Sequence, residues 1–312
     1  MRIFLAGATG AIGRQLVPLL VSDGHDVTGA TRSPTKVDAL RAAEAEPVVL
    51  DALDAAAVRT AVADAKPDVV IHELTALPQR IDPRKMERDF ALNDRLRSEG
   101  TRYLVDAAQA AGARRIIAQS IAFAYAPGPP GTVHVESDPL LPASEAHKSF
   151  RRSAQAMADL ERSVLDAGGL VLRYGYFYGP GSAITRTGSM GSDLARRRLP
   201  IIGRGSGVWS FVQIEDAAQA TVAALSRGAP GAYNIVDDEP ASVAEWLPAL
   251  AESLAAPRPL RVPALLARPL AGRYGVAIMT SAQGASNELA KRELGWQPRH
   301  RSWREGFRSA LG

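Results

Sequence analysis

Cysteine is absent from all 312 residues of the sequence. Its absence excludes disulfide bonds, thiolate metal ligands and cysteine nucleophiles together. The five histidines are scattered and form no His-Glu-x-x-His pattern, so we expect no metal site. The chain also lacks any run of about eighteen or more apolar residues, which argues against a membrane-spanning segment.

Lysine is scarce as well, because only five of the 37 basic residues are lysines. The net charge is +4, but basic runs such as Arg196-Arg197-Arg198 lack interleaved aromatic residues, and acidic residues dilute the others. We therefore expect no nucleic-acid partner. The N-terminal "MRIFLAGATG" has an apolar run of four residues that enters a glycine turn, unlike a signal peptide. We expect a cytoplasmic protein without a membrane partner.

The first half of the chain does contain a regular alternation of short apolar runs and helical stretches. The sequence predicts strands over 2–7, 25–32, 46–52, 67–74, 114–124 and 169–178, and helices over 11–24, 35–45, a segment ending at 63, 85–111 and 150–167. Strands that are apolar throughout and alternate with helices are typical of a parallel sheet covered on both faces. This predicts an α/β fold with a doubly wound, Rossmann-like parallel sheet.

The alternation ends at about residue 178, after which glycine and proline become frequent. We expect residues 1–178 to form a dinucleotide-binding domain and residues 179–312 a smaller, mainly substrate-binding region. Segments at about 208–236 should return to the main sheet, because "GAYNIVDD" (231–238) is typical of one more buried strand.

A glycine-rich loop joins the first predicted strand to the first predicted helix. In "FLAGATGAIGRQL" the glycines are Gly7, Gly10 and Gly13. Glycine permits a tight turn and a close approach of a pyrophosphate to main-chain N–H groups, and the helix N-terminus adds a favourable dipole. We predict that a nicotinamide dinucleotide is held by Gly7, Thr9, Gly10, Ala11, Ile12 and Gly13.

Further motifs follow this Gly-x-x-Gly-x-x-Gly loop in a characteristic order. They are "LDALD" (50–54), "VVIHEL" (69–74), "EGTRYLVDAAQAAGARRIIAQS" (99–120), "LRYGYFYGPG" (172–181), "FVQIEDAAQATVAAL" (211–225) and "ELGWQPRHRSWREGF" (293–307). With these motifs the chain resembles the extended short-chain dehydrogenase/reductases, also called NAD-dependent epimerase/dehydratases. The resemblance implies a nicotinamide cofactor, and it implies cofactor contacts from Asp51, Ala52, Leu74, Thr75, Ser120 and Tyr174.

The residues after the second predicted strand bear on the choice of cofactor. An acidic residue there would hydrogen-bond the ribose 2′-hydroxyl of NAD. This sequence has Thr31 and Arg32 instead, with Lys36 one helical turn later. Two cations can pair with a 2′-phosphate, so we expect NADP(H) in preference to NAD(H).

The resemblance fails at the pair that carries acid–base chemistry in the family, Tyr-x-x-x-Lys. None of the seven tyrosines has a lysine four residues later. If Glu161 matches the glutamate that the family has after this pair, then Ser153 and Met157 stand at the tyrosine and lysine positions. Arg97 likewise stands at the family's usual asparagine position, with Asn93 one turn earlier.

Other residues could supply a proton donor. Ser120 ends the fifth predicted strand, and Tyr125 is the nearest tyrosine to it; the carboxyl end of a parallel sheet is where ligands bind. His147 and Lys148 precede the next predicted helix, and histidine is a plausible acid at neutral pH. A solvated surface location is an equally open interpretation for His147 and Lys148.

The substrate side departs from the family's sugar-nucleotide enzymes. Those usually have an arginine two residues before the phenylalanine of "VWSFVQIED", where this chain has Trp209. A tryptophan offers an apolar face and cannot neutralise a diphosphate. We therefore expect Tyr125, Tyr176 and Trp209 to contact a small, uncharged or aromatic substrate. The alternative is that Trp209 belongs to the core and an arginine such as Arg204 or Arg261 binds phosphate.

Together these features predict an NADP(H)-dependent oxidoreductase that acts on a small carbonyl compound or alcohol with non-standard acid–base residues. Two alternatives stay open: a redox-neutral epimerase, isomerase or lyase on the same scaffold, and an inactive NADP(H)-sensing protein. By analogy with the family, a homodimer through the helices at about 86–111 and 150–167 is possible.

Overall fold

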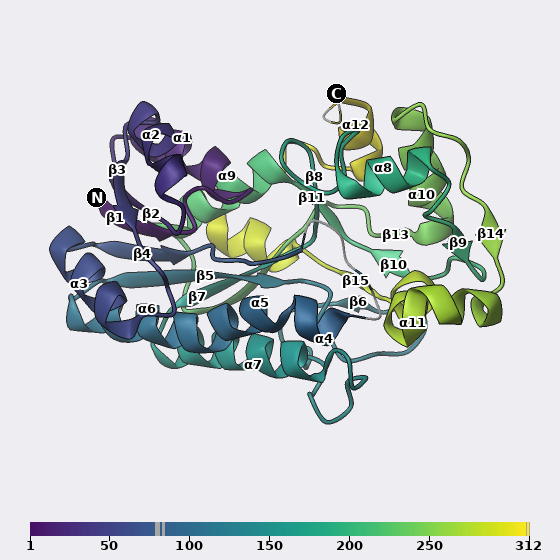
Figure 1. The fold of residues 1–312 in the computed structure, drawn as a ribbon, viewed down its shortest axis with the longest axis horizontal. Helices are drawn as coiled ribbons and strands as arrows, with labels where there is room; N and C mark the ends of the chain where they lie inside the picture. Colours follow the sequence, from purple (N-terminus) through teal and green to yellow (C-terminus); the bar gives the residue numbers. More distant parts are fainter. Residues whose placement is uncertain (79–81, 83–84, 310, 312) are drawn as a thin grey trace.

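The computed structural model describes residues 1–78, 82, 85–309 and 311. A seven-stranded sheet with the order β12-β7-β5-β4-β1-β2-β3 forms its centre, and all neighbouring strands in it are parallel. The strands are β1 (Arg2–Ala6), β2 (Asp26–Thr31), β3 (Glu46–Val49), β4 (Val69–His72), β5 (Arg115–Ile121), β7 (Leu170–Tyr174) and β12 (Gly231–Ile235). The predicted doubly wound α/β fold is confirmed (Figure 1).

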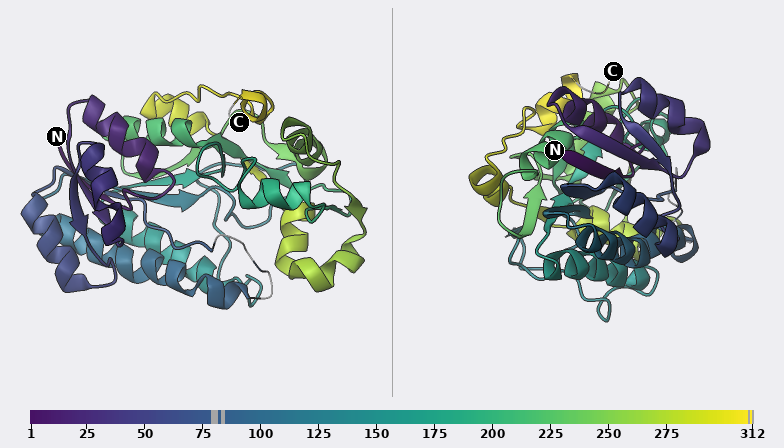
Figure 2. Two further views of the ribbon diagram at one scale, coloured as in Figure 1. Left: turned by 45° about the horizontal axis from the view of Figure 1, so that its top comes forward. Right: turned by 90° about the vertical axis from the view of Figure 1, so that its left-hand side faces the viewer.

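Helices cover both faces of the sheet because successive side chains of its buried strands point to opposite faces. On β1, Ile3 and Leu5 belong to the core under one helix layer, and Phe4 and Ala6 to the core under the other. The first layer contains α1 (Gly13–Ser22), α2 (Val37–Ala42) and α9 (Ile214–Ala224), and the second contains α3 (Ala55–Ala65), α6 (Thr101–Ala110) and α7 (Arg151–Asp166). Figure 2 shows the two layers from other sides.

The single helix expected over 85–111 is instead a chain of shorter pieces. These are α4 (Met86–Asp89), α5 (Ala91–Arg95), the π-helical turn η2 (Leu96–Gly100) and α6. A π-helical turn inserts an extra residue and changes which side chains face inward, and such turns are frequent at functional sites. Here Arg97 of η2 is buried, which a regular amphipathic pattern does not predict for an arginine.

The strand expected over 169–178 also divides, at Gly175. After β7 the chain leaves the main sheet, and β8 (Tyr176–Tyr178) pairs with β11 (Phe211–Gln213). A Cβ at Gly175 would lie 2.6 Å from the Ser210 carbonyl oxygen, so a residue without a side chain is required where the two segments meet.

The later part of the chain packs around a second core, which contains the fully buried rings of Trp246, Trp303, Phe211 and Phe307. Its elements are α8 (Ser189–Ala195), β9 (Ile201–Ile202), β10 (Val208–Trp209), β13 (Ala241–Ser242), α10 (Val243–Ser253), β14 (Arg261–Val262), α11 (Ala264–Ser281) and α12 (Trp303–Ser309). Figure 1 shows most of these at the opposite end from the N-terminus, whereas β12 returns to the main sheet.

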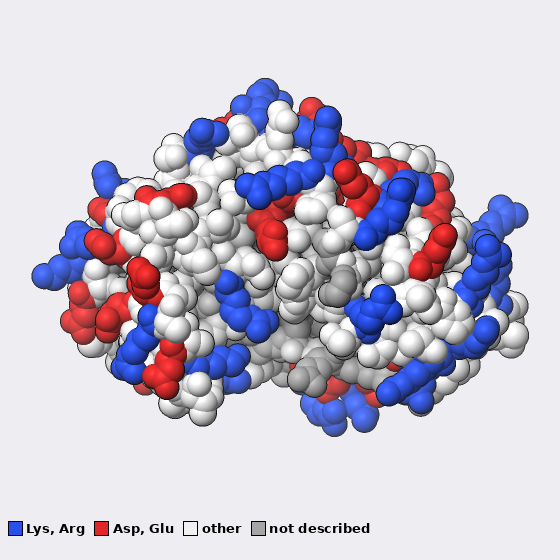
Figure 3. Space-filling model, turned by 90° about the horizontal axis from the view of Figure 1, so that it is seen from above, with Lys and Arg blue, Asp and Glu red and all other residues white. Residues whose placement is uncertain are grey.

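Short elements complete the fold: η1 (Pro34–Lys36), β6 (Val133–His134), β15 (Gly284–Ala285) and η3 (Ala290–Leu294). Within the described residues, none of the helices is long and apolar enough to cross a membrane. Basic and acidic side chains are interspersed over most of the face in Figure 3, where no single large patch of one sign dominates.

Candidate functional site

The loop between β1 and α1 packs against the end of β4. A Cβ at Gly7 would lie 2.5 Å from the Glu73 carbonyl oxygen, and φ at Gly7 is +94°. A Cβ at Gly13 would collide with the Gly7 carbonyl oxygen. Both positions therefore require glycine, and the loop can close tightly at the carboxyl edge of the sheet.

This loop leaves main-chain donors available to an anion. The Gly7 N–H donates to the Ala30 carbonyl and the Gly10 N–H to the Gly7 carbonyl. Among the described residues, no acceptor is present for the N–H groups of Thr9, Ala11 and Ile12. Unpaired N–H groups at the start of a helix form a favourable environment for a phosphate. The loop thus fits the pyrophosphate of a dinucleotide.

The end of β2 carries cations. The Thr31 hydroxyl is buried and lies 2.9 Å from Thr9 Oγ1, which joins the glycine loop to β2. Arg32 and Lys36 are exposed, and neither has an ion-pair partner within the described part of the chain. Asp51, which was also predicted to contact the cofactor, follows β3. Its side chain is exposed and accepts a hydrogen bond from the Leu53 N–H. The neighbouring Ala52 is buried.

Two buried titratable side chains end β4. His72 lies 2.9 Å from the Thr101 hydroxyl and accepts from the Leu74 N–H, and burial lowers its pKa to about 4, so the ring is neutral. Burial raises the pKa of the Glu73 carboxyl to about 8. Both side chains are buried where the chain leaves β4, whereas Leu74 is partly buried and Thr75 is exposed.

Tyr174 is joined to Glu73 instead of facing open space. Its hydroxyl donates to Glu73 Oε1 at 3.1 Å and lies 2.7 Å from the Thr221 hydroxyl on α9. Tyr174 is 1 % exposed, and burial raises its pKa well above the usual value. The second carboxyl oxygen of Glu73 has no partner among the described residues. Glu73 was not among the residues predicted for the site, although an acidic residue at the end of an apolar run is a signal visible in the sequence.

Ser120 and Tyr125 belong to one buried hydrogen-bond network. The Ser120 hydroxyl donates to Glu161 at 2.7 Å, and the Arg173 guanidinium binds both oxygens of Glu161 at 3.0 and 2.7 Å. Arg173 also donates to the Tyr125 hydroxyl at 2.8 Å, which donates to Asn234 at 2.7 Å. The hydroxyl protons of both predicted catalytic residues are therefore engaged with protein acceptors, and burial raises the Tyr125 pKa.

His147 and Lys148 lie in the turn before α7. The His147 ring is partly buried, and its Nδ1 lies 2.8 Å from the Ser149 hydroxyl. Lys148 is exposed. The structure does not bring either residue into the Ser120 network.

Tyr176 and Trp209 form one aromatic stack with Phe123. The Tyr176 ring lies 4.1 Å from the Phe123 ring and 3.8 Å from the Trp209 ring, between centroids. Trp209 is 6 % exposed, and its Nε1 donates to the Ile278 carbonyl of α11. The stack connects the second core to α11, and it leaves little of Trp209 for contact with a substrate.

A second polar cluster involves α5, η2, α7 and α11, and the sequence did not predict it as a unit. It contains Asp94 of α5, Arg97 of η2 and Ser153 of α7, all of which are buried, together with Tyr274 of α11. The Tyr274 ring stacks on Phe150 at 4.6 Å and so brings α11 against the start of α7. Sequence analysis identified Arg97 and Ser153 as departures from the family pattern, but nothing local connects them to Tyr274.

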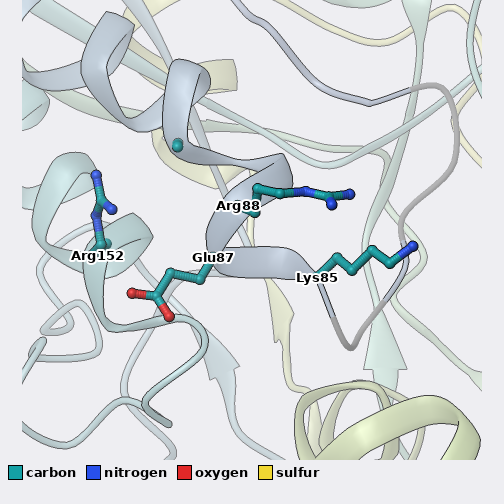
Figure 4. Close-up of a pocket in the computed structure, with 5 residues that line it drawn as sticks. Lys85, Glu87, Arg88 and Arg152 are labelled. Carbon is teal, nitrogen blue, oxygen red and sulfur yellow. The ribbon is translucent and has the colours of Figure 1, made fainter.

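An open hollow of about 560 Å³ lies on the outer side of α4 and α7. Its lining consists of Lys85, Glu87, Arg88, Ala91 and Arg152, and Figure 4 shows Glu87 pointing to the side of Arg152 while Lys85 and Arg88 point away. The hollow is shallow and lined by surface chains, so the cofactor loop and the buried clusters are better candidates for chemistry.

Comparison with known proteins gives consistent results. Residues 3–236 match the NAD dependent epimerase/dehydratase family. A Streptomyces protein named 3-diazoavenalumate denitrifying reductase is 47% identical over 312 residues, covering 98% of this chain and 99% of the relative. A UDP-glucose 4-epimerase of Mycolicibacterium smegmatis is 28% identical over 309 residues, covering 96% of this chain and 94% of that protein.

Solved structures of similar fold span the whole chain. A Thermus thermophilus UDP-glucose 4-epimerase in complex with NAD has a TM-score of 0.77 at 22% identity, covering 100% of this chain and 98% of the other. A dTDP-glucose 4,6-dehydratase of Streptomyces venezuelae with NAD bound has a TM-score of 0.78 at 20% identity, covering 100% and 96%. At these identities the likeness supports the fold alone.

Proposed function

The chain belongs to the NAD dependent epimerase/dehydratase family, and we propose that within it this protein is an NADPH-dependent reductase of a small aromatic diazo compound. The family resemblance inferred from the motif order is confirmed, as is the expectation of an oxidoreductase or epimerase/dehydratase-like enzyme. The proposal adds two points to this family assignment, namely the class of substrate and the preference for NADPH.

The observation that carries the proposal is the combination of a missing proton donor with a reductase relative. Hydride addition to a ketone leaves an alkoxide, which needs an acid at its oxygen; a tyrosine beside a lysine meets that need. At the corresponding positions of α7 this chain has Ser153 and Met157, both buried and neither an acid at neutral pH. Met157 lies in an apolar cluster with Phe150.

A diazo group makes a different demand. When hydride reaches the terminal nitrogen of an arenediazonium ion, an N–H bond forms and the positive charge is lost. The resulting aryldiazene then gives up its N–H proton, the C–N bond breaks with its electron pair left on the ring carbon, dinitrogen leaves, and the ring carbon takes a proton from water. No alkoxide forms in these reaction steps, so no tyrosine–lysine pair is required to protonate one. A substrate of this class agrees with the name of the Streptomyces relative, a diazo-compound denitrifying reductase.

The cofactor part of the proposal relies on two places in the fold. When bound, nicotinamide would supply the hydride. The N–H groups of Thr9, Ala11 and Ile12 would hold the pyrophosphate, and Arg32 and Lys36 would pair with a 2′-phosphate because no carboxylate occupies the end of β2. The structural relatives contain NAD, so the choice between the two cofactors depends on these two cations.

An isotope experiment tests the proposed reaction. The purified protein is mixed anaerobically with an arenediazonium salt labelled with ¹⁵N and with NADPH deuterated at nicotinamide C4. We expect one equivalent of labelled dinitrogen per NADPH consumed, above the rate measured without protein, and a slower release than with undeuterated NADPH.

Other outcomes would identify the alternatives. NADPH oxidation with ketones but no dinitrogen from the diazonium salt would replace the proposal with a carbonyl reductase. Interconversion of UDP-glucose and UDP-galactose without net NADPH consumption would indicate a redox-neutral epimerase. Binding of NADPH without any turnover would favour a sensing protein.

A further inference from the structure

The polar cluster of Asp94, Arg97, Ser153 and Tyr274 is assembled from separate parts of the fold. Asp94 and Arg97 lie around the π-helical turn that follows α5, and Ser153 lies on the first turn of α7. Tyr274 arrives on α11, just beyond a kink at Gly272, where φ is +63° and ψ is 174°. Only glycine adopts this conformation readily, and the kink reorients the second half of α11.

Two charged side chains of this cluster are buried without bonding partners. Asp94 is 4 % exposed, and neither of its carboxyl oxygens has a partner with hydrogen-bond geometry among the described residues, although the Ser153 hydroxyl faces it. Arg97 is 8 % exposed and has no hydrogen bond or ion pair within the described part of the chain. Buried charged groups normally have partners, so these two groups are arranged for something else.

The nearby carboxylate of Glu161 does not satisfy Arg97. Both Glu161 oxygens are bound by Arg173, and one of them also accepts from Ser120. Arg97 therefore interacts with Glu161, Asp94 and Tyr274 only through their electrostatic fields. Asp94 and Arg97 remain a buried acceptor and a buried donor that interact electrostatically without forming an ion pair with one another.

From this arrangement we infer that Asp94 and Arg97 hold a hydroxyl group on the aromatic ring of the substrate. That the substrate is aromatic rests on the proposed function. A hydroxyl accepts from a guanidinium and donates to a carboxylate at the same time. A carboxylate would be repelled by Asp94, and an ammonium group by Arg97, so neither complements the pair. Asp94 and Arg97 therefore select substrates that carry a hydroxyl group on the ring.

The walls of the cluster suit an aromatic ring. Phe150 and Tyr274 stack with their ring centroids 4.6 Å apart, and both belong to an apolar cluster that includes Met157 and Ile121 at the end of β5. A ring that packs against these side chains would lie at the carboxyl edge of the sheet, where ligands of doubly wound folds bind.

Calorimetry on the whole protein loaded with NADP⁺ tests the inference without requiring turnover. The probes are 4-methylphenol and 4-methylanisole. Both have an oxygen that can accept a hydrogen bond, but the methyl ether cannot donate one. We expect the wild type to bind the phenol about 10- to 100-fold more tightly, as for a hydrogen bond to a charged group. The preference should fall at least several-fold in Asp94→Asn, because the acceptor of the phenol's hydrogen bond loses its charge. Arg97→Met should weaken both probes to a similar extent, because both probe oxygens can accept from the guanidinium.

Matched controls make the same chemical changes on exposed positions of α6, Arg102→Met and Asp106→Asn, and should keep the wild-type preference. Equal affinity for both probes in the wild type, a preference that survives Asp94→Asn, or unchanged affinity for both probes in Arg97→Met would overturn the inference. Cofactor titration checks that each variant is folded, and the isosteric Asp94→Asn decides if Arg97→Met does not fold.

The inference and the proposed function can fail separately. Release of labelled dinitrogen together with equal binding of the two probes would remove the hydroxyl site and keep the reductase. A clear preference for the phenol without reduction of any diazonium salt would keep the hydroxyl site and remove the diazo reaction.

Discussion

Comparing Gly7→Ala with Gly112→Ala separates the conformational cost of a side chain at positive φ from the cost of a steric collision. Gly7 has φ +94°, and its missing Cβ would lie 2.5 Å from the Glu73 carbonyl oxygen at the end of a central strand. Gly112 has a similar φ of +72°, but a Cβ there would meet nothing within 4 Å. Gly112→Ala therefore measures the conformational cost alone, and Gly7→Ala measures that cost plus the collision.

The two costs can be estimated. A residue with a side chain in the left-handed region loses about 1–2 kcal/mol. A collision with backbone that cannot move freely adds about 1–3 kcal/mol or more. We expect Gly112→Ala to lower the free energy of unfolding by about 1–2 kcal/mol and Gly7→Ala by about 2–5 kcal/mol.

The same collision should displace the loop amides that face the pyrophosphate. We expect Gly7→Ala to weaken NADPH binding by about tenfold or more, as for the loss of one charge-assisted hydrogen bond, while Gly112→Ala binds normally. Urea denaturation followed by tryptophan fluorescence gives the stabilities, and NADPH fluorescence gives the affinities. Equal stability losses in the two variants, or an unchanged affinity in Gly7→Ala, would refute the reasoning.

Three further predictions follow from the site. Arg32→Ala should weaken NADPH binding by about tenfold and leave NADH binding nearly unchanged, whereas Arg41→Ala on α2 should affect neither; equal losses for both cofactors would contradict the 2′-phosphate assignment. The pKa of Glu73 is raised to about 8, so its proton binds the folded state more tightly, and stability is lost as pH rises from about 4.5 to about 8. Glu73→Gln should therefore gain stability relative to the wild type over this window, by a few kcal/mol at pH 8, and a pH-independent difference in urea denaturation would argue against it. Tyr125→Phe should lower the free energy of unfolding by about 1–3 kcal/mol, because its buried partners lose a bond, while the pH profile of turnover stays the same; an altered profile at unchanged stability would instead assign catalysis to this hydroxyl.

The parts of the fold that the sequence predicted well depend on local patterns. Continuous apolar runs predicted the six strands of the first half, and Gly7, Gly10 and Gly13 located the loop at the carboxyl edge of the sheet. The predicted helix over 85–111 was interrupted, because the extra residue of the π-helical turn at 96–100 is set by what packs against it.

The candidate site was predicted less completely than the fold. Ser120 was chosen because it ends the fifth predicted strand and Tyr125 because it follows soon after. Ser120 does lie near the end of β5 and Tyr125 beyond it, but their hydroxyls are engaged by Glu161 and Asn234. The partners come from α7 and β12, and no local pattern in the sequence connects such distant segments. Glu73 was missed because its partner, Tyr174, is likewise contributed by a distant strand.

By itself the sequence determined the order of the elements, the glycine loop, the cations after β2 and the absence of a Tyr-x-x-x-Lys pair, because each is a property of neighbouring residues. Only the tertiary structure decided which polar groups are satisfied. It paired Arg173 with Glu161, and it left Asp94 and Arg97, near Tyr274, without hydrogen-bond or ion-pair partners in the described part of the chain. The physical reason is that the bonding and the energy of a buried charged group depend on every segment packed around it. Those segments, such as α11 and α7, come together only when the chain has folded.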